Sequence, residues 1–261
     1  MVCKTRVIAL RHRPVSSPDP HLHVLIPAAG IGARAGGAGP KQYRDVAGKA
    51  LVAHTLAAFR ALGGQLRTLA LVVAPDDACV AQALPDFAQQ HADGCREVLL
   101  PVGGATRADS VRAGLQALRE LGAHAQDWVL VHDAARCLVT PVQLQALIQA
   151  CLQDPVGGLL ALPLPDTLKR SDASGRVAAT VSREHMWLAQ TPQMFRLDML
   201  ARALDSAQAS GLAVTDEASA IEAAGLAPQL VPGSVQNFKI TYPEDFALAE
   251  AVLLARRGAA S

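Results

Sequence analysis

The chain has 261 residues, of which 51% are hydrophobic, and a formal net charge of +1. This length and apolar content are enough for one α/β domain with a large core. A balanced charge argues against binding by neutralisation of a nucleic-acid backbone, and aromatic residues at 3% are too few for a base-stacking surface. We therefore expect no nucleic-acid partner. No apolar run approaches the roughly 18 residues that cross a bilayer, so we expect no membrane partner either.

The chain ends and the cysteines bear on location. Residues 1–23 lack a sustained apolar run, so we interpret them as a disordered extension rather than a secretory signal. Residues 24–256 would form the domain, followed by a tail at 257–261. The five cysteines show no C-x-x-C spacing, which favours reduced thiols in the cytoplasm.

Short apolar runs alternate with amphipathic segments in the first part of the chain. Strands are expected at residues 24–26, 68–73, 97–100, 128–131 and 158–162. Helices are expected at 50–62, 76–90 with an interruption near Pro85, 108–121 and 141–152. This order predicts a single Rossmann-like α/β domain with a mostly parallel twisted sheet, helices on both faces, and ligands at the carboxyl ends of the strands.

The pattern breaks between residues 163 and 193. Two polar, alternating segments at 166–170 and 176–181 flank a turn, which predicts a β-hairpin arm projecting from the domain. Helices are then expected at 197–210 and 217–224, and strands at 228–231 and 238–240. Thr241 and Glu244 form a capping-box pattern that predicts a last helix, ending near Arg256.

The loop after the first strand is the most informative segment. It holds the small residues of 27–32, then Arg34, a glycine-rich stretch and Lys41. Small residues let backbone N–H groups approach phosphates, and the two cations add positive charge, which suits a nucleoside triphosphate. The loop is not a Walker loop, because Lys41 follows Pro40 and no Ser or Thr comes next. The alternative is a glycine-rich surface loop with two solvated cations.

A second glycine-containing turn joins the strand at 97–100 to the next helix. Gly103 and Gly104 would let backbone groups touch a flat ligand edge, and Ser110 offers a hydroxyl, which predicts a wall of a base and ribose pocket. The alternative is a plain strand-to-helix turn with Arg107 on the surface.

Four polar residues lie in or after other expected strands, or at the start of a helix. Asp133, just beyond the strand at 128–131, would bind Mg²⁺ or substrate hydroxyls, or else cap its loop. His132 beside it is interpreted as a hydrogen-bonded strand-end residue rather than a general base. Thr215 would cap a helix and bind phosphate there. Lys239 lies in an apolar run, where a Lys either extends to solvent or meets an anion at the ligand edge.

Eight motifs then occur in a recognisable order. They are Pro-Ala-Ala-Gly-x-Gly-x-Arg at 27–34, Pro-Lys-Gln-Tyr at 40–43, Gly-Gly-x-x-Arg-x-x-Ser-Val at 103–111, Val-His-Asp-Ala-Ala-Arg at 131–136, Asp-Thr-x-Lys at 166–169, Thr-Pro-Gln at 191–193, Thr-Asp-Glu-Ala-Ser at 215–219 and Lys-Ile-Thr at 239–241. With these motifs, residues 24–256 closely resemble the 2-C-methyl-D-erythritol 4-phosphate cytidylyltransferases of isoprenoid precursor biosynthesis.

The resemblance implies a nucleotidyltransferase domain and a reaction between CTP and methylerythritol phosphate. A phosphate oxygen of the acceptor attacks the α-phosphorus of CTP, and pyrophosphate leaves with Mg²⁺. The nucleophile is already an anion, so no general base is needed, and catalysis is positioning plus charge stabilisation. The metal would be held mainly by the CTP phosphates, with Asp133 as a candidate ligand.

The resemblance also implies roles for individual residues. Arg34 and Lys41 would stabilise the reacting α-phosphate, and Lys239 and Arg183 would hold the attacking phosphate. Nucleotide binding would fall to Ala28, Ala29, Gly30, Gly32, Gly104 and Ser110. The acceptor would be surrounded by Asp133, Thr191 and Thr215, together with the partner's Thr167 and the partner's Arg136.

The arm at 163–185 resembles the family's dimerisation arm, which implies a homodimer with Arg183 reaching the neighbour's site. Two positions depart from the family pattern. Cys137 stands where Pro is common after Ala-Ala-Arg, and Ala105 stands where some members carry Asp. Two alternatives remain open. One is a cytidylyltransferase acting on ribitol 5-phosphate, and the other is a catalytically silent nucleotide-binding protein on the same fold.

Overall fold

The computed structural model describes residues 20–30, 39–87 and 94–259. Arg34 and Gly32 of the predicted phosphate loop, and nearly all of the expected N-terminal extension, lie outside the described residues. Within the described part, no helix is long and apolar enough to cross a membrane.

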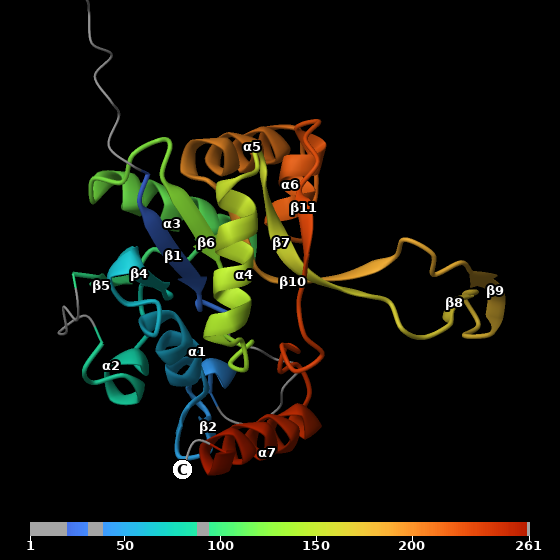
Figure 1. The fold of residues 1–261 in the computed structure, drawn as a ribbon, viewed down its shortest axis with the longest axis horizontal. Helices are drawn as coiled ribbons and strands as arrows, with labels where there is room; N and C mark the ends of the chain where they lie inside the picture. The colour runs from blue at the N-terminus through green and yellow to red at the C-terminus, as the bar shows by residue number, and fades with distance from the viewer. Residues whose placement is uncertain (1–19, 31–38, 88–93, 260–261) are drawn as a thin grey trace, which may run out of the picture.

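A seven-stranded sheet forms the centre of the molecule, in the order β11-β7-β10-β6-β1-β4-β5 (Figure 1). The strands are β1 Leu22–Pro27, β4 Leu66–Val72, β5 Arg96–Leu100, β6 Trp128–Val131, β7 Gly157–Pro163, β10 Trp187–Arg196 and β11 Gln229–Pro232. Every pairing is parallel except those of β10, which runs antiparallel between β6 and β7. The predicted mostly parallel sheet is confirmed.

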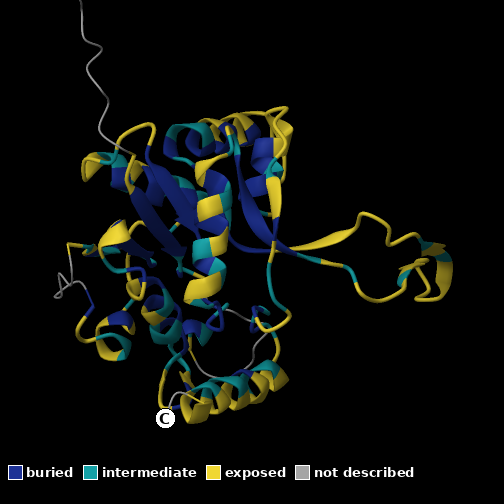
Figure 2. Cartoon of the chain, viewed as in Figure 1, coloured by how far each residue is buried: buried dark blue, intermediate teal, exposed yellow. Residues whose placement is uncertain are grey.

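Helices cover both faces of this sheet because the buried strands are apolar on both sides (Figure 2). On one face lie α1 Leu51–Arg60 and α4 Pro141–Leu152; on the other lie α3 Arg107–Glu120, α5 Leu197–Ala209 and α6 Glu217–Ala223. Successive strand side chains point to opposite faces. Val24 and Ile26 of β1 therefore pack in the α1 and α4 layer, while Leu25 packs in the α3 and α5 layer.

A smaller layer surrounds the last helix, α7 Pro243–Ala259, which packs near a short ribbon of β2 Asp45–Val46 and β3 Lys49–Ala50. Its buried cluster includes Cys137 and Ile240, so the Cys137 thiol is packed in the interior. Two single-turn 3₁₀ helices also occur, η2 Lys41–Tyr43 and η3 Gly63–Gln65.

Four local predictions need correction. The expected strand at 238–240 is wrong: this segment is irregular, and Ile240 makes one backbone bond, donating to Ala135 O at 2.9 Å. The expected helix at 76–90 shrinks, in its described part, to α2 Val80–Ala83. The last helix is capped by Asp245 rather than Glu244, because Asp245 Oδ2 accepts from the N–H of Thr241 at 2.7 Å. The strand β10 was not expected at all.

The predicted hairpin arm is confirmed. Its strands, β8 Leu168–Ser171 and β9 Val177–Val181, pair only with each other and stand well away from the sheet (Figure 1). Most residues of the arm are exposed (Figure 2). A two-stranded hairpin of this kind has little stability of its own, and its strands pair with no other strand in the described part of the chain.

Candidate active site

A cavity of about 240 Å³ opens at the carboxyl ends of β1 and β6, the edge where the parallel strands predict a ligand. It is lined by the backbone after β1, by the start of η2, by the turn before α3, by the loop after β6 and by one residue of the segment before α7. The lining residues are Pro27–Gly30, Lys41, Gln42, Gly104–Arg107, Ser110, Asp133–Ala135 and Lys239.

Hydrogen bonds from neighbouring segments hold the loop after β1 in place. Ala28 N donates to Val72 O at 2.7 Å, and the buried Gln42 donates its Nε2 to Ala28 O at 2.6 Å. Lys41 donates its Nζ to Ile240 O at 2.7 Å, which ties η2 to the segment that carries Lys239. Gln42 was not among the predicted site residues, although it belongs to the Pro-Lys-Gln-Tyr motif.

The turn before α3 forms the opposite wall. Gly104 N donates to Ser110 Oγ at 3.0 Å, and this hydroxyl donates to Thr106 O at 3.0 Å. Thr106 and Asp109 form a capping box that starts the helix. The structure thus places Gly104 and Ser110 at the cavity, with the Ser110 hydroxyl supporting the turn; contact with a base and ribose stays a prediction.

Asp133 is the centre of a charged cluster. Its Oδ1 accepts from Arg107 Nε at 2.8 Å, its Oδ2 from Lys239 Nζ at 2.8 Å, and Arg136 Nε lies 3.7 Å from Oδ2. Burial by itself would raise the pKa of Asp133, but Arg107, Lys239 and Arg136 hold that pKa well below its usual range. The carboxylate is therefore ionised at neutral pH.

Arg107 and Glu217 were missed by the sequence reasoning. Arg107 donates Nη1 and Nη2 to Glu217 Oε1 and Oε2, at 2.6 and 3.0 Å, in the bidentate arrangement typical of strong pairs. Burial opposes the Arg107 charge, yet Glu217 and Asp133 together raise the pKa of Arg107. The surface position considered for Arg107 is wrong. Both residues stand in recognised motifs, but no spacing rule shows that they meet across 110 positions.

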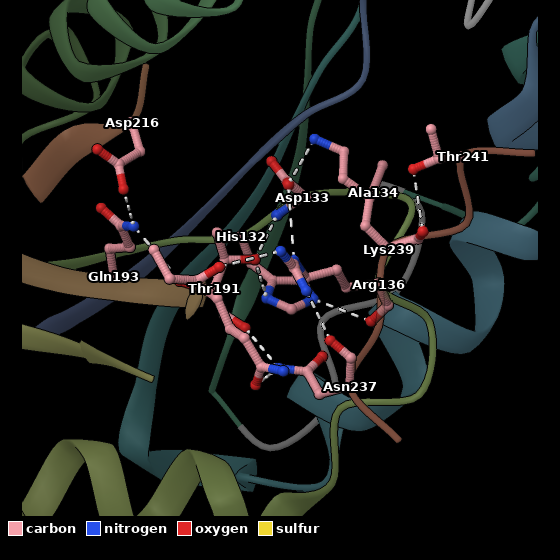
Figure 3. A network of polar contacts seen from close by, with 12 residues as sticks. His132, Asp133, Ala134, Arg136, Thr191, Gln193, Asp216, Asn237, Lys239 and Thr241 are labelled. Atoms are coloured by element: carbon pink, nitrogen blue, oxygen red, sulfur yellow. Dashed lines mark hydrogen bonds and ion pairs between the residues drawn. The ribbon is translucent and has the colours of Figure 1, made fainter. Parts of the chain in front are cut away.

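A buried polar network lies beneath Asp133 (Figure 3). Asp133 N donates to Thr191 Oγ1 at 3.0 Å, Thr191 Oγ1 lies 3.0 Å from His132 Nδ1, and His132 Nε2 lies 3.1 Å from Arg136 O. Since a carbonyl only accepts, His132 carries its proton on Nε2 and accepts from the Thr191 hydroxyl. Burial lowers the pKa of His132 to about 4, so it is neutral at pH 7. The structure agrees with the interpretation of His132 as a hydrogen-bonded strand-end residue.

Thr191 and Arg136 differ from their expected placement. Thr191 is 4% exposed and supports the backbone of Asp133 without lining the cavity. Arg136 lies beside Asp133 of its own chain and donates Nη1 to Asn237 O at 2.7 Å. It therefore belongs to the cluster without any second chain.

Thr215 also differs. The cap of α6 is Asp216, whose carboxylate accepts from Ser219 N at 3.0 Å, so the predicted Thr215 cap is wrong. A carboxylate one residue closer to the helix is the stronger acceptor for those N–H groups. Thr215 is exposed and lines a neighbouring cavity of about 420 Å³, which shares Arg107 with the first.

Two predicted residues lie far from this cavity. Thr167 and Arg183 are both exposed on the arm, and Arg183 Nη1 donates to Pro165 O within the arm itself. The arm leaves the domain (Figure 1), so these two side chains do not reach Asp133 in the same chain.

The family model described as "IspD: 2-C-methyl-D-erythritol 4-phosphate cytidylyltransferase" matches residues 22–255. The chain belongs to this family. It is a nucleotidyltransferase, and the resemblance noted in its motifs is confirmed.

Relatives of known name agree with this assignment. A 2-C-methyl-D-erythritol 4-phosphate cytidylyltransferase of Paraburkholderia phytofirmans is 54% identical over 243 residues, covering 92% of this chain and 98% of the relative. A bifunctional enzyme IspD/IspF of Albidiferax ferrireducens is 59% identical over 243 residues, covering 93% of this chain but 55% of that longer protein. A crystal structure of a 4-diphosphocytidyl-2C-methyl-D-erythritol synthase is 38% identical, with a TM-score of 0.76, covering 91% of this chain and all of that one.

Proposed function

We propose that this chain transfers CMP from CTP to 2-C-methyl-D-erythritol 4-phosphate, giving 4-diphosphocytidyl-2-C-methyl-D-erythritol and pyrophosphate. The observation that carries the proposal is the convergence of Lys41, Lys239 and Arg107 on one cavity, around a single ionised carboxylate. Two small-residue backbone segments face the same space, at Ala28–Gly30 and at Gly104. Phosphates suit such a cavity because it offers fixed charges together with accessible N–H groups.

The chemistry asks little of the protein beyond placement and charge. The acceptor phosphate is already an anionic nucleophile, and the buried, neutral His132 has no access to it. Lys41 would stabilise the charge that develops on the α-phosphate, and Lys239 would hold the attacking phosphate. The bond from Lys41 to Ile240 O fixes the Lys41 ammonium against the segment that carries Lys239. Both cations reach the same cavity, where they would hold nucleophile and phosphorus next to each other.

Magnesium fits this donor set only as a metal held mainly by the triphosphate. Among the described residues no group of three His, Cys, Asp or Glu side chains could hold a metal ion. Asp133 could serve as one carboxylate ligand once Lys239 leaves its Oδ2, whereas both Glu217 oxygens are bound by Arg107. Mg²⁺ commonly binds through one or two carboxylates plus substrate phosphates, which matches this arrangement. When bound, the metal would neutralise triphosphate charge.

We further propose that the enzyme works in the cytoplasm as a homodimer joined through the arm. Among the described residues the two arm strands pair with no other strand, and the base of the arm exposes Met186, Trp187 and Leu188. A two-fold partner would cover these apolar side chains and the open hairpin. It would also bring the partner's Thr167 and the partner's Arg183 to this chain's cavity.

The activity is tested by pyrophosphate release from CTP and Mg²⁺, with either methylerythritol phosphate or ribitol 5-phosphate as acceptor. We expect release with methylerythritol phosphate and CTP, and far less with ATP, GTP or UTP. Equal rates with UTP, or a preference for ribitol 5-phosphate, would overturn the proposal. No release with any nucleotide would favour a silent nucleotide-binding protein.

The shared site is tested with mixed dimers of Lys41→Ala and Arg183→Ala. Each homodimer should be nearly inactive, because every site lacks one cation. In a mixed dimer one site carries both changes and the other carries neither. Random assembly makes about half of the dimers mixed, so about a quarter of all sites are intact and activity should return to about that fraction of the parent's. Mixed dimers without recovery would mean that Arg183 does not act across the interface.

A further inference from the structure

Two cations bond the Asp133 carboxylate closely in the free protein, while the third, Arg136, lies further away, with its Nε 3.7 Å from Oδ2. Arg107 binds one carboxylate oxygen and Lys239 binds the other, each at 2.8 Å, and the Asp133 side chain is only 10% exposed. Under the proposed function Lys239 turns from this carboxylate to the acceptor's phosphate. A carboxylate this buried is strongly destabilised when it loses its partner, so one cation has to remain on Asp133 after Lys239 leaves.

The two cations are held very differently. Lys239 is 35% exposed, faces the cavity, and has Asp133 as its ion-pair partner. Arg107 makes two further charge-assisted bonds, to the two oxygens of Glu217. Glu217 is 1% exposed and cannot exchange Arg107 for water. Lys239 is therefore the cation free to move, and Arg107 is the one that stays.

Glu217 is itself firmly placed. It is the first residue of α6, and the next backbone N–H, of Ala218, donates to Gln193 Oε1 at 2.7 Å. Gln193 lies on β10, paired with Val131 of β6, two residues before Asp133. Gln193 thus links the start of α6, where Glu217 lies, to β6, the strand that Asp133 follows.

We infer that Glu217 is a positioning residue for acceptor binding. By fixing Arg107, it keeps Asp133 ionised and oriented while Lys239 transfers to the acceptor's phosphate. This inference rests on the proposed function, because it concerns the acceptor phosphate. It makes a distinction that a purely structural ion pair would not make: Glu217 should matter for the acceptor and not for CTP.

The test is Glu217→Gln, with the kinetic constants for each substrate measured separately. A glutamine offers one acceptor oxygen and no charge, so Arg107 loses one of its two bonds to this position and the charge that anchors it. Hydrogen bonds to charged groups contribute about 1.5–3 kcal/mol, so kcat/KM for methylerythritol phosphate should fall about 10- to 100-fold. KM for CTP should stay within about twofold of the parent's, because Arg107 would hold Asp133 and not the triphosphate.

Asp205→Asn is the matched control. Asp205 pairs with Arg112, at 2.8 Å, between α5 and the same helix α3, but outside the 240 Å³ cavity. The substitution removes one carboxylate charge from an exposed Arg–carboxylate pair of the same helix. Both kinetic constants should remain within about twofold of the parent's, since exposed pairs contribute little.

A double variant shows whether Glu217 acts through Arg107. A lysine at position 107 cannot bridge Asp133 and Glu217 as the guanidinium does. Arg107→Lys should therefore by itself lower kcat/KM for methylerythritol phosphate by most of the amount expected for Glu217→Gln. Adding Glu217→Gln should then change kcat/KM little further, because the residue it positions is gone. Losses that multiply in the double variant would overturn the inference.

Other outcomes are equally decisive. Glu217→Gln with an unchanged acceptor constant, or with KM for CTP raised as much as KM for the acceptor, would also overturn it. If this variant fails to fold, Glu217→Asp keeps the charge with a shorter reach and should give a smaller, acceptor-only loss; two unfolded variants would make Glu217 structural and the inference wrong. An inactive parent would instead refute the proposed function, so the two failures are distinguishable.

Discussion

The substitution Gly103→Ala tests the close contact between the two backbone walls of the cavity. A Cβ built at Gly103 would lie 2.3 Å from the Cβ of Ala29 and 2.7 Å from Val73 O. Carbon atoms pack at about 3.5–4.0 Å, so the loop after β1 and the turn before α3 would have to separate by about 1 Å. Both contacts are to atoms held by backbone, since Gly103 N also donates to Val73 O at 2.8 Å.

The expected cost follows from this geometry. Overpacking a well-fitted interior costs about 1–3 kcal/mol, and we expect the free energy of unfolding to fall by that amount. A misplacement of about 1 Å at reacting groups costs about 10²-fold in rate, so kcat/KM should fall by a similar factor. Urea unfolding measures the first quantity, and steady-state pyrophosphate release with CTP and methylerythritol phosphate measures the second.

Gly258→Ala is the control for adding a methyl group elsewhere. Nothing lies within 4 Å of a Cβ at Gly258, which is in the exposed part of α7. This change should leave activity unaltered and raise helix stability by as much as about 1 kcal/mol. If Gly103→Ala kept both its stability and its activity near the parent's values, the two walls would not be in the contact described.

Two further predictions concern charge. Lys41→Ala should lower kcat by about 10²–10³, with only the small loss of urea stability expected from removing its bond to Ile240 O. Lys41→Arg should also have a low kcat, because a planar guanidinium does not replace a compact ammonium; a kcat near the parent's would mean that Lys41 is only a solvated charge. The free energy of unfolding should fall as the pH drops from 6.5 toward 4. In this range His132 is protonated in the unfolded chain but stays neutral in the folded protein, where burial lowers its pKa. For a folded pKa of about 4, His132 alone contributes about 3 kcal/mol of this loss at pH 4; urea unfolding of His132→Asn should show a shallower slope, and an unchanged slope would contradict the assignment.

The position of Asp133 could be read from the sequence because its strand is short and unambiguous. The apolar run at 128–131 coincides with β6 Trp128–Val131, and all four residues are buried. A charged residue directly after such a run has to emerge at the carboxyl edge of a parallel sheet. The loop after β1 was located by the same reasoning.

The strand β10 could not be read in this way. Its buried positions include Gln190, Thr191 and Gln193, which interrupt the apolar pattern that marks a strand. These side chains are buried because they bond neighbouring segments: Gln190 Nε2 donates to Ser234 O at 2.8 Å, and Gln193 Nε2 donates to Asp216 Oδ2 at 2.8 Å. Hydropathy alone does not distinguish such a strand from a loop.

The segment around Lys239 misled in the opposite direction. Phe238 and Ile240 flank it and suggest alternation, yet Ile240 is buried against α7 and no ladder forms. Glu217 was equally hidden, since an acidic residue at a helix start is explained by the helix dipole. Its buried pairing with Arg107 depends on α3 and α6 meeting beside β6, which only the three-dimensional structure reveals.

The ion pairs of the free site explain how several cations can be assembled before a substrate arrives. Lys239, Arg107 and Arg136 all lie within 4 Å of the Asp133 carboxylate, and without it their mutual repulsion would be uncompensated. Asp133 thus keeps the cations in place, at the expense of the affinity lost when Lys239 is withdrawn to bind phosphate. A site with no such carboxylate would bind phosphate more tightly but would have to be ordered by it. Under the proposed function, this arrangement favours preorganisation of the attacking and stabilising charges over ground-state binding, which is the choice that raises kcat.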